Sequence, residues 1–152
     1  MELDYAIMAE RADGLTDGRY CVFGGDADCV ETSNLPVPLQ LAIVARFLLR
    51  PDEPLENHTV ELAVTRPDGK RGVIGGPLSL ETKRNEFDPD APSGARVIIN
   101  LIMLIHEQGT YALHIIGDGS DRKEIRLYVK LIESQDPKKA QSDGPVEIQN
   151  SK

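Results

Sequence analysis

The strongest constraint on the fold is a pair of apolar runs in the last third of the chain, at residues 97–105 and 111–116. A short polar link that ends at Gly109 joins the two runs. Apolar runs of this length with so short a link between them are typical of a β-hairpin. We therefore expect residues 95–117 to form the central ribbon of a β-sheet.

Both faces of this expected ribbon are apolar. If Gln108 and Gly109 form the turn, the side chains alternate by face, and the first face carries Ile98, Ile102, Leu104, Tyr111, Leu113 and Ile115. On the first strand, the second face carries Val97, Ile99, Leu101, Met103 and Ile105. A strand that is apolar on both faces must be covered on both. The cover of the second face is either another segment of this chain or a second molecule, so this face is the candidate interaction surface.

The remaining periodicity also predicts strands. Residues 39–49 alternate in polarity over a long run, for which a buried helix is the alternative, and residues 125–132 alternate between apolar and charged positions. Pro67-Asp68-Gly69 is a turn signal, because proline fixes one backbone dihedral angle and glycine supplies the other. About eight strands with frequent turns favour an all-β fold, an antiparallel β-sandwich of Ig-like or jelly-roll type.

The chain divides into a folded part and a tail. Its 152 residues suffice for one domain with a proper core. Apolar alternation is lost after residue 132, so residues 1–132 are expected to form the sandwich domain and residues 133–152 a disordered tail. Inside the tail, Pro145-Val146-Glu147-Ile148 is a short extended patch that could add to the edge of a sheet, in its own molecule or in a partner.

The net charge limits the classes of partner, and the first residues bear on the location of the protein. The net charge of -8 opposes binding to nucleic-acid phosphates and to anionic lipid, so we expect neither a nucleic-acid nor a membrane partner. The first residues are acidic and show no export signal, and no apolar run is long enough to cross a bilayer as a helix. These features predict a cytoplasmic protein.

The two cysteines flank a predicted turn. Residues 19–23 and 28–32 are expected to pair as a short hairpin, which would set Cys21 opposite Cys29. A disulfide bond between them is geometrically conceivable. In a reducing compartment both are expected to remain small buried thiols.

Aspartates in the predicted turns suggest an alternative function. Asp88 and Asp90 lie in the long loop before the central ribbon, and Asp118 and Asp121 lie in the turn after it. Hard cations bind several oxygen ligands that converge from loops, as in calcium-binding sandwiches of the C2 type. Aspartate is also a common turn residue. Calcium or small-ligand binding by these four residues is therefore the alternative to an interaction role.

Signatures of catalysis are absent from the sequence. His106 has no second histidine at the spacing of a zinc-binding helix, and Ser120 lacks the residues of a nucleophile elbow. The glycine-rich segments match neither a dinucleotide-binding fingerprint nor a phosphate-binding loop. We expect a protein that is not an enzyme and has no cofactor.

Four segments in the first half of the chain resemble a family of short bacterial proteins that is defined as a domain of unknown function. They are DYAIMAERAD, GRYCVFGGDAD, PVPLQLAIVARF and HTVELAVTRPDG. The resemblance implies a bacterial β-sandwich and brings no activity with it. Together these observations predict a non-catalytic interaction module that binds a protein partner or a second copy of itself.

Overall fold

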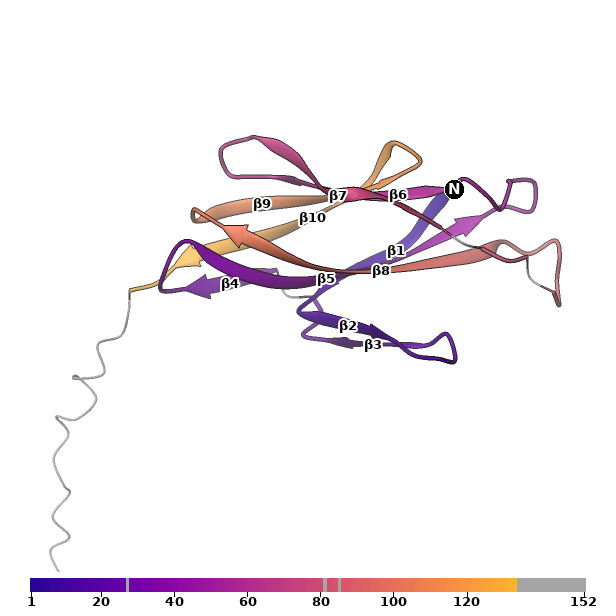
Figure 1. Cartoon of the computed structure of the whole chain (residues 1–152), viewed down its shortest axis with the longest axis horizontal. Coiled ribbons are helices and arrows are strands. Elements are labelled where there is room, and N and C mark those ends of the chain that lie inside the picture. Colours follow the sequence, from indigo (N-terminus) through magenta and orange to yellow (C-terminus); the bar gives the residue numbers. More distant parts are fainter. Residues whose placement is uncertain (27, 81, 85, 134–152) are drawn as a thin grey trace, which may run out of the picture.

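The structure, a computed structural model, describes residues 1–26, 28–80, 82–84 and 86–133. The predicted tail, residues 133–152, therefore lies outside the described residues except for Glu133. The described residues form ten strands and no helix (Figure 1). The strands are β1 (Glu2–Ala9), β2 (Arg11–Gly14), β3 (Tyr20–Phe23), β4 (Cys29–Thr32), β5 (Val37–Leu49), β6 (Thr59–Thr65), β7 (Arg71–Ser79), β8 (Ser93–Ile105), β9 (Gly109–Gly117) and β10 (Ser120–Leu131).

The strands form two main sheets, which are stacked as two layers (Figure 1). One sheet has three strands in the order β1-β5-β8, and the other has five in the order β4-β10-β9-β6-β7. Every neighbouring pair in these sheets is antiparallel except β4 and β10, which are parallel. The expected all-β fold is confirmed, with ten strands where about eight were expected.

The core lies between the two layers, and both sheets contribute to it. Alternate residues of each inner strand point into this space, which is why the sequence alternates with a period of two. Fully buried side chains come from β5, β6, β8, β9 and β10, and they include Phe47, Ile43, Leu62, Ile105, Leu113, Ile115 and Leu127. Burial of each such aliphatic or aromatic side chain contributes about 1.5–3 kcal/mol.

The predicted central hairpin is wrong. Residues 97–105 and 111–116 do form strands, but β8 pairs with β5 and β9 pairs with β10 and β6. The link at residues 106–108 crosses from one sheet to the other. Apolar alternation specifies a strand but not its neighbour, and β5 offers β8 an equally apolar partner of the same thirteen-residue length.

A small β2–β3 ribbon covers part of the outer face of the three-stranded sheet. Ala9, Ala12, Ala42 and Val44 form a second buried cluster there, against which Ile98 of β8 is packed. Asn100 fixes the ribbon to β8, because its side-chain amide donates to Ala12 O at 3.1 Å. A segment of the same chain thus covers one end of this face.

Candidate functional site

The five predicted interaction residues lie on the inner face of β8. Met103 and Ile105 are buried in the main core, and Val97, Ile99 and Leu101 are half-buried against it. The predicted hairpin assigned the faces the other way round, because it placed β8 and β9 in one sheet. The opposite set is the outer one, and there Ile102 and Leu104 are 74% and 51% exposed.

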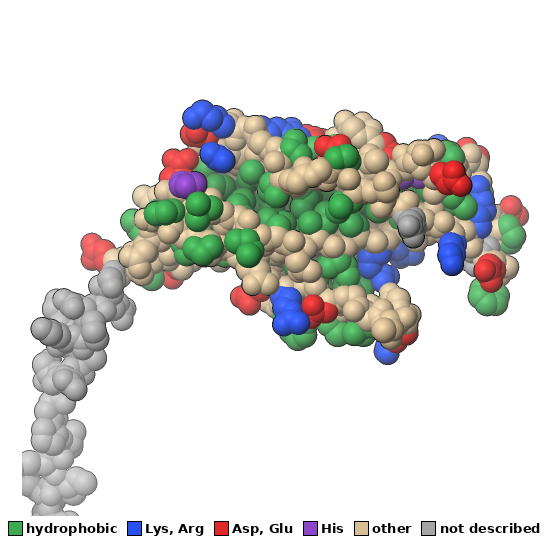
Figure 2. All heavy atoms as spheres, in the orientation of Figure 1, with side chains coloured by type: hydrophobic (Ala, Val, Ile, Leu, Met, Phe, Trp, Pro, Cys, Tyr) green, Lys and Arg blue, Asp and Glu red, His purple; other side chains and the backbone are tan. Residues whose placement is uncertain are grey.

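Half-burial of the inner residues arises because the core is open along one side of the molecule. Ile99 and Leu101 line a groove together with Ile74 and Leu78 of β7, and its volume is about 230 Å³. Leu78 pairs with Val60 and Ile74 pairs with Leu62, so these two β7 side chains also point inward. Leu78 is nevertheless 42% exposed. Figure 2 shows hydrophobic side chains along this gap between the two sheets.

A second hollow continues the groove toward the end of β8. Its lining includes Val73 and Ile74 of β7, Ile102 and Leu104 of β8, and Tyr111 of β9, and its volume is about 370 Å³. The Tyr111 hydroxyl donates to Glu107 O at 2.9 Å, which fixes the ring at the mouth of this hollow. The two hollows share Ile74, and together they are called the channel beside β8; Arg66 and His106 add polar groups to its second part.

The edge of β8 along this channel carries no protection. Among the described residues, only β5 pairs with the backbone of β8, so the opposite edge has free N–H and C=O groups. Arg96 is the only charged residue among its thirteen residues. Natural sheets usually blunt such edges with charges, prolines, bulges or covering segments.

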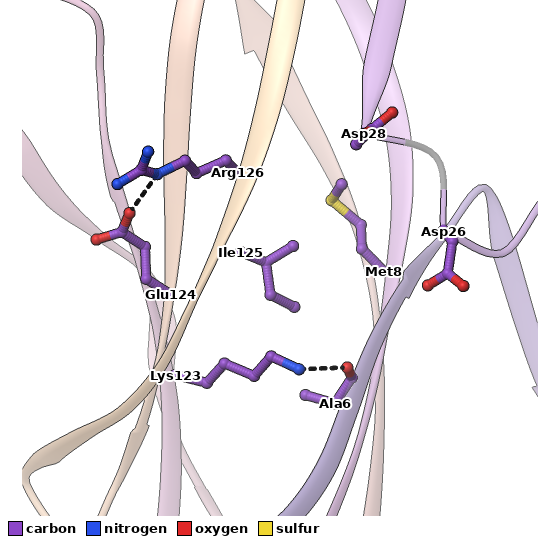
Figure 3. A pocket seen from close by; sticks show the side chains of 8 residues that line it. All are labelled: Ala6, Met8, Asp26, Asp28, Lys123, Glu124, Ile125 and Arg126. Carbon is purple, nitrogen blue, oxygen red and sulfur yellow. Dashed lines mark hydrogen bonds and ion pairs between the residues drawn. The ribbon is translucent and has the colours of Figure 1, made fainter.

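The other edge of the same sheet is covered. On β1, Ala6 O accepts a hydrogen bond from Lys123 Nζ at 3.1 Å, and Met8 O accepts one from the backbone N–H of Asp26 at 2.9 Å. Figure 3 shows Lys123 reaching from β10 toward Ala6 across this side of the molecule. Both carbonyl groups are therefore satisfied and unavailable to a further strand.

The edges of the five-stranded sheet are blunted in other ways. At one edge, β7 contains Gly75 with a φ of 79°, followed by Gly76 and Pro77, and its register with β6 shifts between Val60 and Leu62. Proline lacks the N–H group that a ladder needs. At the other edge, β4 has only four residues. Among the residues that the structure describes, nothing comparable blunts β8, the longest of the four outer strands.

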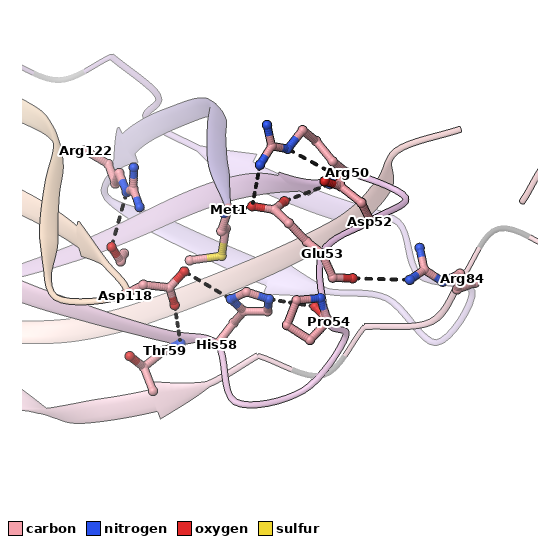
Figure 4. Close-up of polar contacts among 11 residues, drawn as sticks. Met1, Arg50, Asp52, Glu53, Pro54, His58, Thr59, Arg84, Asp118 and Arg122 are labelled. Carbon is pink, nitrogen blue, oxygen red and sulfur yellow. Dashed lines mark hydrogen bonds and ion pairs between the residues drawn. The ribbon is translucent and has the colours of Figure 1, made fainter. Parts of the chain in front are cut away.

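Asp118, one of the four predicted calcium ligands, is engaged with protein groups (Figure 4). Its carboxylate lies 3.0 Å from His58 Nδ1 and accepts a hydrogen bond from the backbone N–H of Thr59 at 3.1 Å. Burial alone would raise the pKa of Asp118, but the hydrogen bonds from Thr59 and His58 lower it below its usual value. This carboxylate joins the start of β6 to the turn between β9 and β10.

Asp121 is also held by protein groups. The guanidinium of Arg71 donates to both of its carboxylate oxygens, at 2.9 and 2.5 Å, and this pairing lowers the pKa of Asp121. His114 Nδ1 lies 3.7 Å from the same carboxylate, and its Nε2 lies 2.9 Å from Thr65 Oγ1. A distance of 3.7 Å is too long for a hydrogen bond, so the hydrogen-bond partner of His114 is Thr65 and not Asp121.

Asp88 and Asp90 lie in the loop before β8, where the backbone N–H of Asp90 donates to Asp88 Oδ1 at 3.2 Å. Within the described part of the chain, no cluster of three or more His, Cys, Asp or Glu residues could hold a metal ion. The structure thus brings Asp118 and Asp121 into one turn but does not assemble the four aspartates as a ligand set. Calcium binding by these residues has no geometric support here.

The predicted hairpin between residues 19–23 and 28–32 is wrong. Instead, β3 pairs with β2, and β4 lies beside β10. Cys21 and Cys29 therefore lie in different sheets, and both are free and exposed, not buried.

Sequence reasoning missed the open groove because an edge strand is defined by the order of strands in the sheet, which local periodicity does not reveal. Two signals were nevertheless present in the sequence. The run IINLIMLI at residues 98–105 contains no charge, and Gly75-Gly76-Pro77 marks a strand that cannot pair regularly.

A family model described as a family of unknown function, DUF6941, matches residues 4–130. The chain belongs to this family. No curated protein matches the sequence. Among solved structures, the chain is similar to the Pseudomonas fluorescens alkylpurine DNA glycosylase AlkC bound to DNA containing an abasic site analog, with 14% sequence identity and a TM-score of 0.43. That match covers 69% of this chain and 28% of the glycosylase chain.

Within the described ranges, no helix has the length and apolar character needed to cross a membrane.

Proposed function

We propose that this DUF6941 protein is a non-catalytic interaction module that binds an extended segment of a protein partner along the free edge of β8. The observation that carries the proposal is the contrast between edges. β1 is covered, β4 is short and β7 is interrupted, whereas β8 has thirteen residues and no such device among the described residues. An unprotected edge next to an apolar groove is the surface that strand addition requires.

Strand addition would use two kinds of contact. The backbone of the incoming segment would pair with the free N–H and C=O groups of β8, and its alternate side chains would enter the groove between β7 and β8. Ile74, Leu78, Ile99 and Leu101 would then lose their remaining exposure to water. Burial of two aliphatic side chains of the partner would add about 3–6 kcal/mol of favourable free energy before the cost of ordering the segment.

The remaining features support the same class of function. Three strands facing five favour an Ig-like sandwich over a jelly roll. The net charge of -8 favours a protein partner over nucleic acid or anionic lipid. Two free, exposed cysteines favour a reducing compartment, the cytoplasm.

Selection from a library of displayed random peptides tests this function directly. We expect the full chain to select peptides with apolar residues at every second position, and Ile102→Lys to weaken their binding at least tenfold, because a lysine on the edge opposes a further strand. Ile102 is largely exposed, so this variant should still fold.

The matched control is Phe23→Lys, which places the same charge at a position on β3 that is 54% exposed. Because β3 pairs with β2 and lines neither hollow beside β8, this variant should bind the selected peptides with nearly wild-type affinity. Failure to select any alternating peptide, or equal binding by wild type and Ile102→Lys, would overturn the proposal.

A further inference from the structure

The strand orders of the two sheets favour a single added strand in the groove over a second folded copy of the chain. The hydrogen bond from Lys123 of β10 to Ala6 of β1 sets β1 opposite β10. By the strand orders of the two sheets, β5 is then opposite β9, and β8 is opposite β6. β7 therefore extends beyond β8, consistent with a groove lined by β6, β7 and β8 together. A strand added beside β8 would lie over β7. A second sandwich docked by its own β8 would bring its own β6 into the space that β7 occupies.

The chain itself supplies a segment that follows directly from the end of this groove. The backbone N–H of Leu131 donates to the side-chain Oε1 of Gln108 at 3.3 Å, and Gln108 lies three residues after the last residue of β8. β8 and β10 end at the same end of the molecule (Figure 1). The nineteen residues 134–152 therefore follow from the point where the channel beside β8 ends.

The composition of these nineteen residues singles out one short stretch. Val146 and Ile148 are their only Val, Ile, Leu, Met or aromatic residues, and Glu147 lies between them. In an extended conformation the two β-branched side chains point to one side and the glutamate to the other. This is the pattern that a groove between two sheets accepts, with apolar residues inward and the charge toward water.

We propose that residues 145–148 bind in the β7/β8 groove of their own molecule as a strand antiparallel to β8. Val146 and Ile148 would pack against Ile74, Leu78, Ile99 and Leu101. This inference rests on the proposed function, because the segment occupies the surface that a partner would use. The tail then acts as a built-in competitor that a partner must displace.

The length of the intervening chain permits this arrangement. Twelve residues, 134–145, separate Glu133 from Val146 and can span up to about 40 Å when extended. A strand of thirteen residues such as β8 is about 43 Å long, so Val146 can reach most of the groove from its end. A tether of this length holds the segment at an effective concentration in the millimolar range, so even a weak contact would be populated.

Hydrogen exchange of the full chain tests the proposal. With the segment bound, amides on the free edge of β8 should be protected, and the double variant Val146→Asp with Ile148→Asp should exchange them at least tenfold faster. The matched control is Gln149→Asp with Asn150→Asp, which adds the same charge just outside the segment and should leave β8 exchange unchanged. Equal exchange in wild type and the Val146→Asp/Ile148→Asp variant would overturn the proposal.

Affinity for the selected peptides separates this proposal from the proposed function. If the tail occupies the groove nine-tenths of the time, removing its apolar residues should tighten peptide binding about tenfold. If wild type and the double variant bind the peptides at β8 with equal affinity, the tail contact is refuted and the proposed interaction function stands. If neither protein binds any peptide, both proposals are refuted. Light scattering should show a monomer at all concentrations, and a dimer that the double variant abolishes would refute binding within one molecule.

Discussion

Lys123 Nζ donates a hydrogen bond to Ala6 O at 3.1 Å, across the side of the molecule where the outer strand of one sheet meets the other sheet. This contact covers one edge of the three-stranded sheet, and no equivalent contact among the described residues covers the other edge at β8. The two sides of the molecule therefore differ in what they can bind.

Removal of the lysine should expose the covered edge. Lys123→Met leaves Ala6 O without its donor, so we expect the free energy of unfolding to fall by about 1 kcal/mol. Urea denaturation measures this change, and light scattering would detect any association through the newly exposed β1 edge. Lys130→Met is the control, because Lys130 makes only an exposed pair with Glu31 and its loss should change stability by less than about 0.5 kcal/mol.

Adjacent positions at the end of β8 should respond very differently to truncation. Ile105 is fully buried, so Ile105→Ala should lower the free energy of unfolding by about 2–5 kcal/mol. Leu104 is half exposed, so Leu104→Ala should cost less than about 1 kcal/mol. Chemical denaturation of the two variants provides the comparison. A larger loss for Leu104→Ala would restore the face assignment that a β8–β9 hairpin requires.

Asp118 should make stability depend on pH in the acid range. Its pKa is lowered in the folded state, so the unfolded state binds the proton at a higher pH and the stabilisation is lost as pH falls below about 4. Asp118→Asn should lower the free energy of unfolding by about 2 kcal/mol at pH 7. Its unfolding free energy should then change less than that of wild type between pH 5 and pH 3. Parallel curves for the two proteins would contradict this role.

Glu53 provides a second acid-sensitive contact. The amino group of Met1 lies 2.5 Å from Glu53 Oε1, and this hydrogen bond, with a further one from the backbone N–H of Arg50, lowers the pKa of Glu53 to about 2 (Figure 4). Its stabilisation is complete above the usual carboxyl pKa and should be lost as pH falls toward 2. Thermal unfolding at pH 7 should show Glu53→Gln destabilised by about 2 kcal/mol. The control Asp52→Asn alters an exposed carboxylate 3.7 Å from Arg50 and should have little effect.

Local sequence patterns are enough to predict where the strands lie, but not which strands pair with one another. The alternation in residues 39–49 and 125–132 and the turn at Pro67-Asp68-Gly69 depend only on local geometry, and β5, β10 and the β6–β7 turn appear there. The link at residues 106–108 looks like a hairpin turn, but whether it stays in one sheet depends on contacts with β5, more than fifty residues away. The inner and outer faces of β8, and the candidate site with them, follow from that distant pairing.

Mapping amide protection upon peptide binding tests the central claim most directly. The full chain, saturated with a selected alternating peptide, should gain hydrogen-exchange protection in β8, at residues 93–105, and in the facing part of β7. The edges of β1 and β4 should remain unchanged. Protection centred on β1 or β4, or none at β8, would contradict the account.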